Sequence, residues 1–525
     1  MMHKRIEDCV IAVVLAVSVF LVSFFYMDGN CKWGDDFAAY LSEGIAIAEN
    51  RFEEQTHVNY ILHNGLLPQD ASSENRLVYV WGYPLILSLV YRIVGFDRIS
   101  YCSVFYYKLP SLICLALLAA VVYLFMARRL NRPLALILSV MLCVNTEFLL
   151  FVEYLIYSDI VFLCSVMVTL LLGDFFFDSI RAGHSHKRVC AWGIALGISL
   201  WATYEIRLNG VLICGVIAAA HLLLWIKNRE VFRRQPILIR FLPYLLFFLL
   251  KLISEALLAP ATSNTADLAL WTPASAISNL RYYGSLLNSW LRGLIFNRRY
   301  SWAAGLYDVT PILFGFLFLA GVFTYGLRRD LPLLLYFFVN GAGVCLLPYV
   351  QGLRYIYTLL PLFLLFAAYG LLFVLHMLKK LLVHAIGKTD PFPSWKRRHA
   401  AALLAAICFS VYRTIPIVEK DLALRSEPRV QAETYSEKAV DMYRFIREFT
   451  SPDSLIMFYK ARSLYLNTER LAVKDNEEKL LQADYYLVNK MRSAQGFSLS
   501  DDALSHIHVC YENQEFVLYQ IEKAS

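Results

Sequence analysis

The sequence predicts a polytopic α-helical membrane protein with a small α/β domain at its C-terminal end. Of its 525 residues, 58% are hydrophobic and only 17% are charged, whereas soluble domains average about 45–50% apolar and about 25% charged residues. The apolar residues gather in long stretches, and the last 108 residues are polar. This composition excludes a soluble globular protein, a disordered chain and a disulfide-rich scaffold.

Eleven apolar stretches of about 15–25 residues approach the length of roughly 20 residues that a membrane-spanning helix needs. The first follows Lys4 and Arg5 as in a signal peptide, but no small-residue cleavage site follows it, so it is expected to be a membrane anchor. The predicted spans are 6–27, 103–127, 133–151, 160–177, 189–203, 210–226, 237–257, 304–326, 331–348, 356–377 and 400–417.

The distribution of Lys and Arg predicts the orientation. The segments on one side carry 20 Lys and Arg in 64 residues, and those on the other carry 11 in 141 residues. Because basic loops stay in the cytoplasm, the N-terminus is expected inside and the C-terminus outside. The basic segments are 1–5, 126–132, 178–190, 226–236, 326–330 and 377–399, and the outer ones are 28–102, 152–159, 204–209, 257–301 and 349–355.

Two domains follow from this division. Residues 1–417 form the transmembrane domain, whose outer loop 28–102 is expected to carry helices beside the membrane. Residues 418–525 form an extracytoplasmic α/β domain, with a helix at Tyr435–Phe449 and strands further on. The strands are expected at Ser454–Tyr459, Ala483–Val488, His506–Tyr511 and Glu515–Ile521, and the domain shows no catalytic constellation in its sequence.

Two adjacent acids, Asp35 and Asp36, come directly after the first span. From Phe37 to Ala48 apolar residues recur at helical spacing, which predicts an amphipathic helix along the membrane. One interpretation is that the acids only cap this helix, since Asp suits an N-cap and the helix dipole. The other is that one of them is a general base for an acceptor hydroxyl. The two interpretations are compatible, because a cap would fix the carboxylate.

The segment that begins at Val80 and ends at Tyr91-Arg92 reads as a second helix in this loop. At about 14 residues it is too short to span the membrane comfortably, so it is expected at the interface. If it were a span, it would reverse every later loop and place the basic ones outside.

The shorter outer loops hold few charges. One has two acids, Glu153 and Asp159, without a base. The next holds Arg207 beside Glu205. These two either pair with each other, or the arginine faces an anionic ligand, because a guanidinium group matches phosphate.

The fifth outer loop ends in Arg354 and Tyr355. Together the outer segments offer carboxylates from two loops and arginines from three. Such a set has the chemistry to bind a phosphate leaving group and to deprotonate a nucleophile, but it does not identify the reaction.

Six short motifs follow one another along the chain: Gly34-Asp35-Asp36, Gly82-Tyr83-Pro84-Leu85, Lys108-Leu109-Pro110-Ser111, Tyr157-Ser158-Asp159, Arg207-Leu208-Asn209-Gly210 and Arg354-Tyr355. In their order and sidedness they resemble the GT-C glycosyltransferases. The branch they resemble more closely contains the protein O-mannosyltransferases and the aminoarabinose transferases. The resemblance covers nearly the whole chain.

The resemblance implies a GT-C membrane fold and a polyprenyl-phosphate-linked sugar donor. Transfer to an acceptor hydroxyl would occur on the extracytoplasmic side, usually with inversion. For this chain it implies that Asp35 or Asp36 is the general base and that Asp159 orients the acceptor. Arg207 and Arg354, with Lys108, would neutralise the lipid-phosphate leaving group.

Glu153, Asn209 and Tyr355 are expected to complete the substrate site. No metal site is firmly predicted; in relatives that use a divalent cation, Mg or Mn, the corresponding ligands here are Asp36 and Asp159. The expected partners are the lipid-linked donor, a lipid, polysaccharide or protein acceptor, and the membrane, without nucleic acid. The expected location is the plasma membrane, with several spans and with the active site outside the cell.

Two other functions remain open from the residues alone. A transporter or flippase of lipid-linked glycans often shows inverted repeats, and no clear repeat of hydropathy is visible. A glycan polymerase or ligase outside the GT-C fold also uses arginine-bearing loops, but the early acidic pair favours GT-C. Spacing alone does not decide whether Cys31, Cys102 and Cys510, all in predicted outer segments, form a disulfide.

Overall fold

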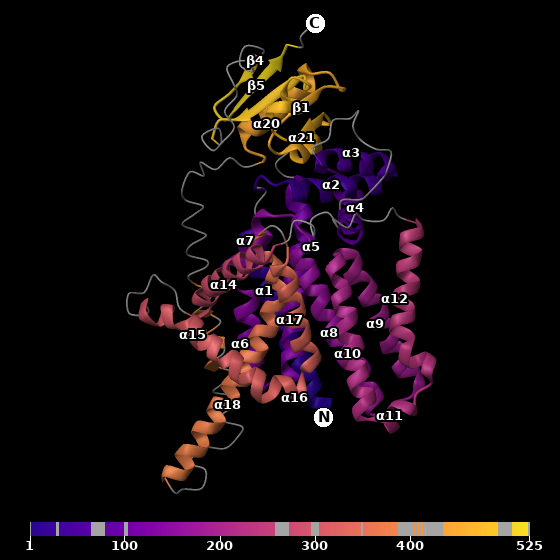
Figure 1. Ribbon diagram of the computed structural model, residues 1–525, viewed down its shortest axis with the longest axis vertical. Helices are drawn as coiled ribbons and strands as arrows, with labels where there is room; N and C mark the ends of the chain where they lie inside the picture. The colour runs from indigo at the N-terminus through magenta and orange to yellow at the C-terminus, as the bar shows by residue number, and fades with distance from the viewer. Residues whose placement is uncertain are drawn as a thin grey trace.

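The molecule consists of a bundle of long helices with a small sheet at one end and a layer of short helices between them (Figure 1). The computed structural model describes residues 2–27, 31–64, 79–98, 103–257, 272–295, 304–347, 350–386, a few positions between 404 and 415, 434–491 and 507–522.

In the described part of the chain, eight helical segments are long and apolar enough to cross a membrane, or nine when the bent pair α6–α7 counts as one span. This is a multi-pass membrane protein. The bundle helices are α1 (Met2–Tyr26), α5 (Ser103–Ala127), α6 (Arg132–Cys143), α7 (Thr146–Tyr154), α8 (Asp159–Arg181), α9 (His186–Ile206), α10 (Val211–Lys227), α12 (Ile237–Leu257), α15 (Ala304–Gly321), α17 (Leu331–Cys345) and α18 (Leu360–Ile386).

Short segments join these helices. They are η2 (Leu208–Gly210), α11 (Arg229–Arg233), the π-helical turn η4 (Val322–Gly326), α16 (Leu327–Arg329) and η5 (Leu353–Leu359). The predicted loop 257–301 also contains a helix that the sequence did not reveal, α14 (Pro273–Ile295).

Two predicted spans differ from the structure. The stretch 133–151 is not one helix, because Asn145 starts a new one by accepting a hydrogen bond from the main-chain N–H of Phe148 at 3.0 Å. The two pieces are bent by 44°. The stretch 331–348 forms the 15-residue helix α17, shorter than a usual span. The predicted span 400–417 lies almost entirely outside the described residues.

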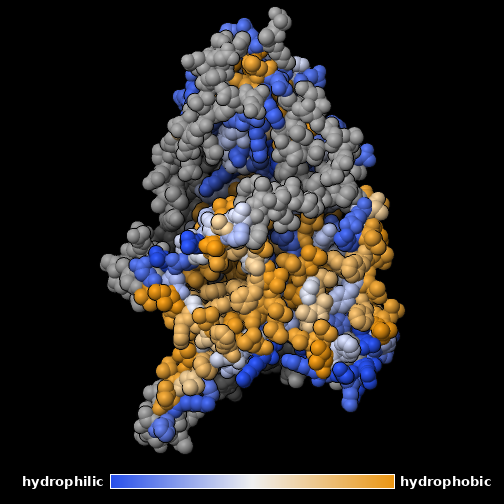
Figure 2. All heavy atoms as spheres, viewed as in Figure 1, coloured by the Kyte–Doolittle hydropathy of each residue, from blue (hydrophilic) through white to orange (hydrophobic). Residues whose placement is uncertain are grey.

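The surface of the bundle confirms its membrane character. In Figure 2 a broad hydrophobic belt covers the helices, and hydrophilic residues gather at its lower edge and around the sheet above. Within the bundle, α15 and α18 pack backbone to backbone. A Cβ atom at Gly321 would lie 1.8 Å from the Phe366 carbonyl oxygen, and one at Gly370 would lie 1.9 Å from that of Leu317. Small residues permit this approach.

The layer above the bundle contains α2 (Asp35–Ala48), α3 (Phe52–Asn64) and α4 (Gly82–Val94). The predicted helix after the acid pair is therefore confirmed, but it does not lie open on the membrane. Every residue from Phe37 to Ala46 is buried, because α4, α3 and α21 (Ala461–Thr468) pack around α2. The segment predicted as an interfacial helix is α4, which packs on α2 and α5.

The C-terminal region forms a five-stranded mixed sheet in the order β2-β1-β3-β5-β4. Strands β1 to β3 run parallel, and β5 and β4 are added as antiparallel strands. The helix and four strands expected here are present, and β2, α21 and α22 are additional. The bounds are α20 (Glu437–Phe449), β1 (Leu455–Met457), β2 (Leu471–Val473), α22 (Glu477–Leu480), β3 (Tyr485–Asn489), β4 (Ile507–Glu512) and β5 (Phe516–Ile521).

The sheet region is fixed to the start of α2. Ser463 on α21 donates a hydrogen bond to the Gly34 carbonyl at 2.8 Å. Trp33 packs against Phe458 and Phe516, with ring centroids 5.6 and 6.0 Å apart. As a result the residues around the acid pair are held between the bundle and the sheet (Figure 1). Cys510, on β4, has a free thiol, and Cys102 lies outside the described residues.

Candidate functional site

The acid pair opens α2, but it does not cap it. The N-cap residue is Gly34, and Asp35 and Asp36 occupy the first turn without a side-chain capping bond. Their position still suits the positive end of the helix dipole. A Cβ atom at Gly34 would lie 2.7 Å from the Tyr157 hydroxyl, so glycine lets Tyr157 approach the start of the helix.

Asp36 lies at the centre of a cluster of cations and hydroxyls. Both terminal nitrogens of Arg354 donate to its Oδ2 atom at 3.1 Å, and the Tyr79 hydroxyl donates to Oδ1 at 2.8 Å. Arg462 lies 4.0 Å from Oδ1. Burial by itself would raise the pKa of Asp36, but Arg354, Tyr79 and Arg462 outweigh it and lower that pKa. The carboxylate is therefore ionised at neutral pH.

Asp35 points to a different environment. Burial raises its pKa, and Lys460, Arg462 and Lys474 of the C-terminal region oppose this rise without cancelling it. Its Oδ1 atom is buried and has no hydrogen-bond partner among the described residues. The two neighbouring acids share Arg462, but their pKa values shift in opposite directions, and only Asp36 is bonded to Arg354.

A second acid–arginine pair lies beside the first. Asp159, the first residue of α8, is 3% exposed and accepts a hydrogen bond from Arg207. The guanidinium groups of Arg207 and Arg354 each lie 5.5 Å from the centre of the Tyr355 ring. Through this ring, the pairs Asp36–Arg354 and Asp159–Arg207 form one continuous row.

The alternative pairing of Arg207 with Glu205 is wrong in this structure. Glu205 is buried, and it accepts a hydrogen bond from the Ser254 hydroxyl of α12 at 2.5 Å. Arg207, the residue that follows α9, adopts an extended conformation and reaches Asp159 instead.

Three other predicted residues have separate positions. Lys108 on α5 is fully buried and donates a hydrogen bond to the main-chain carbonyl of Glu153. Glu153, near the end of α7, is 1% exposed. Asn209 is exposed in η2, two residues after Arg207.

Three residues of this cluster were not proposed as site residues from the sequence: Tyr79, Tyr157 and Arg462. Arg462 is 4% exposed and comes from α21 of the C-terminal region; it accompanies Asp36 and donates to the Tyr79 hydroxyl at 3.2 Å. Tyr157 stacks under Arg354, with 5.0 Å from the guanidinium to the ring centre. Tyr157 belongs to a motif that the sequence did single out, whereas no local pattern distinguishes Tyr79 or Arg462.

A divalent cation, which the sequence leaves open, does not fit the residues present. Asp36 and Asp159, its candidate ligands, are each bonded to an arginine. Over the described ranges, no group of three or more His, Cys, Asp or Glu side chains is arranged to hold a metal ion. A cation at this place would meet the two guanidinium groups, so no chemical step is assigned to a metal.

The architecture was compared with solved structures. ArnT from Cupriavidus metallidurans bound to undecaprenyl phosphate matches with a TM-score of 0.51 and 13% identity over 97% of each chain. The oligosaccharyltransferase AglB from Archaeoglobus fulgidus, in complex with an inhibitory peptide and a dolichol-phosphate, matches with a TM-score of 0.52 and 13% identity. That match covers 92% of this chain and 69% of AglB.

The chain has the GT-C membrane fold. A further AglB structure, in complex with Zn and sulfate, matches this fold with a TM-score of 0.55 at 12% identity. The resemblance read from the six motifs is thereby confirmed for the architecture. No protein-family model and no curated protein sequence matches the chain, so the likeness to known proteins rests on the fold.

Proposed function

We propose that this protein transfers a sugar from a polyprenyl-phosphate-linked donor to an acceptor hydroxyl outside the cytoplasm. The observation that carries the proposal is the row of two acid–arginine pairs joined by Tyr355. ArnT and AglB, which share the fold, have solved structures with undecaprenyl phosphate and with a dolichol-phosphate, respectively. A site that binds a lipid phosphate would explain why arginines gather at the end of a membrane bundle.

Arg207 and Arg354 are the proposed phosphate ligands. A planar guanidinium group matches the oxygens of a phosphate better than an ammonium group does. As the bond between the sugar and the phosphate breaks, negative charge develops on the leaving group, and fixed cations stabilise it. Both arginines are only partly exposed, at 22% and 19% of their side chains, so water screens this charge incompletely.

Asp36 is the proposed general base. It touches Arg354, so it lies beside the phosphate and hence beside the reacting carbon; Asp35 faces the C-terminal region instead. The lowered pKa of Asp36 keeps it ionised before the reaction. The acceptor oxygen attacks the anomeric carbon, its proton passes to Asp36, and the polyprenyl phosphate leaves with the electron pair. Asp159 positions Arg207, and attack opposite to the phosphate inverts the anomeric centre.

An apolar groove next to Arg354 is a suitable place for the polyprenyl chain. It has a volume of about 560 Å³ and is lined from α14, α17, η5 and α18. Ile356, two residues after Arg354, lines it. A donor held there would keep its lipid in the bilayer while its phosphate reaches the arginines.

The proposal also includes the domain division and the membrane location that the sequence predicts. Residues 1–417 would be the transferase domain of a plasma membrane protein, and residues 418–525 an outer domain that contributes Arg462. The acceptor would approach between this domain and the bundle. No geometry distinguishes a lipid, polysaccharide or protein acceptor.

The test is turnover of a panel of polyprenyl-phosphate hexoses and pentoses by the full chain in liposomes, followed as released polyprenyl phosphate. Asp36→Asn should lower turnover by about 10²- to 10⁴-fold, the usual contribution of a general base. Glu54→Gln, an exposed acid of α3, is the control and should keep full turnover. Full activity of Asp36→Asn would overturn the assignment of the base, and full activity of both Asp36→Asn and Asp35→Asn would exclude the whole acid pair from the mechanism. Mass spectrometry of surface glycans with and without the gene would identify sugar and acceptor.

A further inference from the structure

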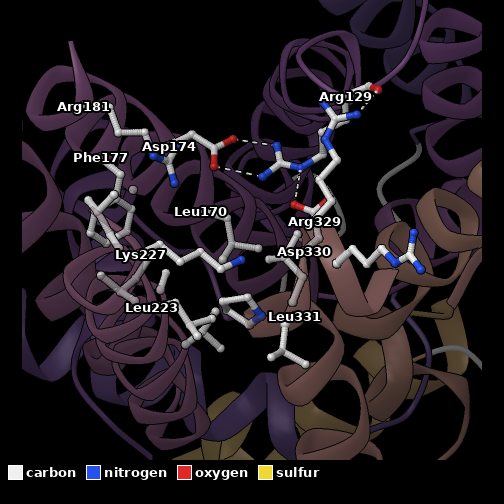
Figure 3. A pocket seen from close by; sticks show the side chains of 18 of the residues that line it. Arg129, Leu170, Asp174, Phe177, Arg181, Leu223, Lys227, Arg329, Asp330 and Leu331 are labelled. Carbon is white, nitrogen blue, oxygen red and sulfur yellow. Dashed lines mark hydrogen bonds and ion pairs between the residues drawn. The ribbon is translucent and has the colours of Figure 1, made fainter. Parts of the chain in front are cut away.

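A pocket of about 240 Å³, seen from close by in Figure 3, lies at the end of the bundle opposite the sheet (Figure 1). It is formed where α8 ends at Arg181 and α10 ends at Lys227, and where α17 begins at Leu331. Five basic and two acidic side chains line it. They are Arg129, Arg181, Lys227, Arg328 and Arg329 against Asp174 and Asp330. One of the basic groups, Arg181, is paired with Asp178 outside the lining at 3.0 Å.

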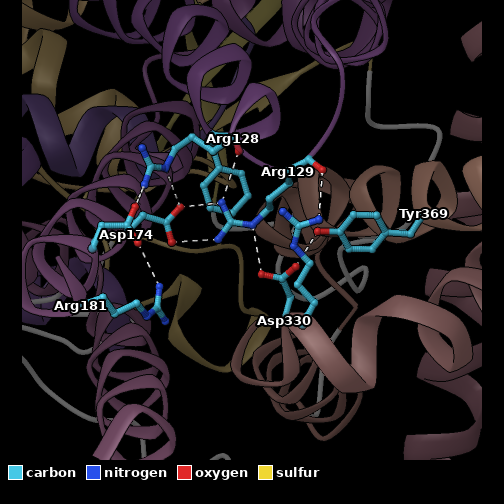
Figure 4. A network of polar contacts seen from close by, with 9 residues as sticks. Arg128, Arg129, Asp174, Arg181, Asp330 and Tyr369 are labelled. Atoms are coloured by element: carbon cyan, nitrogen blue, oxygen red, sulfur yellow. Dashed lines mark hydrogen bonds and ion pairs between the residues drawn. The ribbon is translucent and has the colours of Figure 1, made fainter. Parts of the chain in front are cut away.

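Both acids are already paired with Arg129, as Figure 4 shows. Arg129 donates to the two oxygens of Asp174 at 2.6 and 2.9 Å and to Asp330 at 3.1 Å. Tyr369 of α18 donates to the other oxygen of Asp330 at 2.6 Å. This network joins the turn after α5 to α8, to the start of α17 and to α18, and it leaves neither acid as a partner for Lys227 or Arg328.

Two of the remaining cations are available to bind an anionic ligand. Lys227 and Arg328 form no ion pair with any residue in the part of the chain that the structure describes, and both are exposed. In Figure 3 the Lys227 side chain extends into the pocket. Arg329 lies over the Tyr369 ring at 5.9 Å, which leaves its charge near the same opening.

The rest of the wall is apolar and comes from membrane helices. Leu170 and Phe177 of α8, Ile217 and Leu224 of α10 and Leu333 of α17 line it. Charged residues at the ends of spans, over an apolar wall, match a ligand with an anionic head and a hydrocarbon body. A free inorganic anion would not use the apolar wall.

We propose that this pocket binds the phosphate-bearing headgroup of an anionic phospholipid. The distribution of Lys and Arg predicts this end of the bundle to be cytoplasmic, and basic pockets between membrane helices on that side bind anionic lipid headgroups. The volume accommodates a headgroup, while the acyl chains pass along the apolar wall. The bound lipid bridges α8 and α10 to α16 and α17, so it stabilises the contact between two groups of helices. The site is independent of the proposed transfer reaction.

The test is lipid binding to the purified full chain after detergent delipidation. Phosphatidylglycerol is added back, with phosphatidylcholine and inorganic phosphate in parallel, and binding is followed by native mass spectrometry and thermal shift. Phosphatidylglycerol should bind and raise the melting temperature, whereas the other two should not. Lys227→Gln and Arg328→Gln should each weaken binding roughly fivefold, and the double variant roughly 25-fold, as expected for cations near a lipid surface.

The matched control is Lys187→Gln with Arg188→Gln, two exposed cations at the start of α9 that do not line the pocket. It should bind like the wild type. Equal binding by the Lys227/Arg328 double variant overturns the proposal, as does equal stabilisation by phosphatidylcholine or by inorganic phosphate alone. Unchanged elution in size exclusion shows that each variant is folded.

Discussion

In the proposed mechanism, Asp36 and the donor phosphate compete for the Arg354 guanidinium group, so Asp36→Asn should tighten the binding of a polyprenyl phosphate. In the structure both terminal nitrogens of Arg354 contact Asp36 at 3.1 Å. A phosphate that takes up this guanidinium must displace the carboxylate and must also tolerate its negative charge. The asparagine variant removes the charge and keeps the shape.

The size of the effect follows from the exposure of the pair. Hydrogen bonds to charged groups contribute about 1.5–3 kcal/mol when buried, and exposed ion pairs contribute about 0–1 kcal/mol. The side chains of Arg354 and Asp36 are 19% and 31% exposed, so an intermediate value of about 1–2 kcal/mol applies. This corresponds to roughly 5- to 30-fold tighter binding.

The assay needs only the leaving group, because the donor sugar need not be known. A polyprenyl phosphate is titrated into the purified chain, and the corresponding polyprenol, without phosphate, gives the background. Asp35→Asn is the control, because it removes an equal charge that faces Lys460, Arg462 and Lys474; its effect should be less than twofold. Binding to Asp36→Asn that is weaker than or equal to wild type would refute the competition and with it the proposed position of the phosphate.

Three further outcomes are expected. Arg462→Met removes a cation that lowers the pKa of Asp36, so the acid limb of the pH–activity profile should move to higher pH. Burial raises the pKa of Glu43 on α2 from about 4.5 in the unfolded chain to about 8 in the folded chain. Protonation of Glu43 therefore stabilises the folded chain fully below pH 4.5, and this contribution is lost as the pH rises towards 8. The stability of Glu43→Gln relative to wild type, from thermal unfolding, should therefore rise with pH by up to about 1.4 kcal/mol per unit. Gly370→Ala should lower the melting temperature by forcing α15 from α18, whereas Gly315→Ala, whose Cβ meets nothing within 4 Å, should not.

The helical membrane architecture could be predicted because membrane spans are local properties of the sequence. Length and hydropathy identify a span, and the basic loops suggest its direction. Two features of the helices were not predicted: the break within the stretch 133–151 and the helix α14. Asn145 breaks a stretch that is apolar throughout, and α14 escaped notice because it is a helix inside a loop.

The site could be predicted only in part. The candidates Asp36, Asp159, Arg207 and Arg354 come together in the structure, but their pairing does not follow from sequence. Arg207 has Glu205 two positions away and bonds to Asp159 instead, because Glu205 turns towards α12. A choice of this kind depends on which helices are neighbours, and one sequence does not contain that information.

The C-terminal region contributes Arg462 to the site, and this contact could not be predicted from the sequence either. Arg462 is separated from Asp36 by more than four hundred residues along the chain, yet it contacts Asp36 and Tyr79 together. Since α21 also packs on α2, the C-terminal region holds the helix that carries Asp36, the proposed base, and its Arg462 lowers the pKa of Asp36. Removing this domain would expose α2 and raise the pKa of Asp36 at once, so loss of activity on truncation would not by itself indicate an acceptor-binding role. Arg462→Met separates the two effects, because it changes the charge and leaves the packing of α21 on α2 in place.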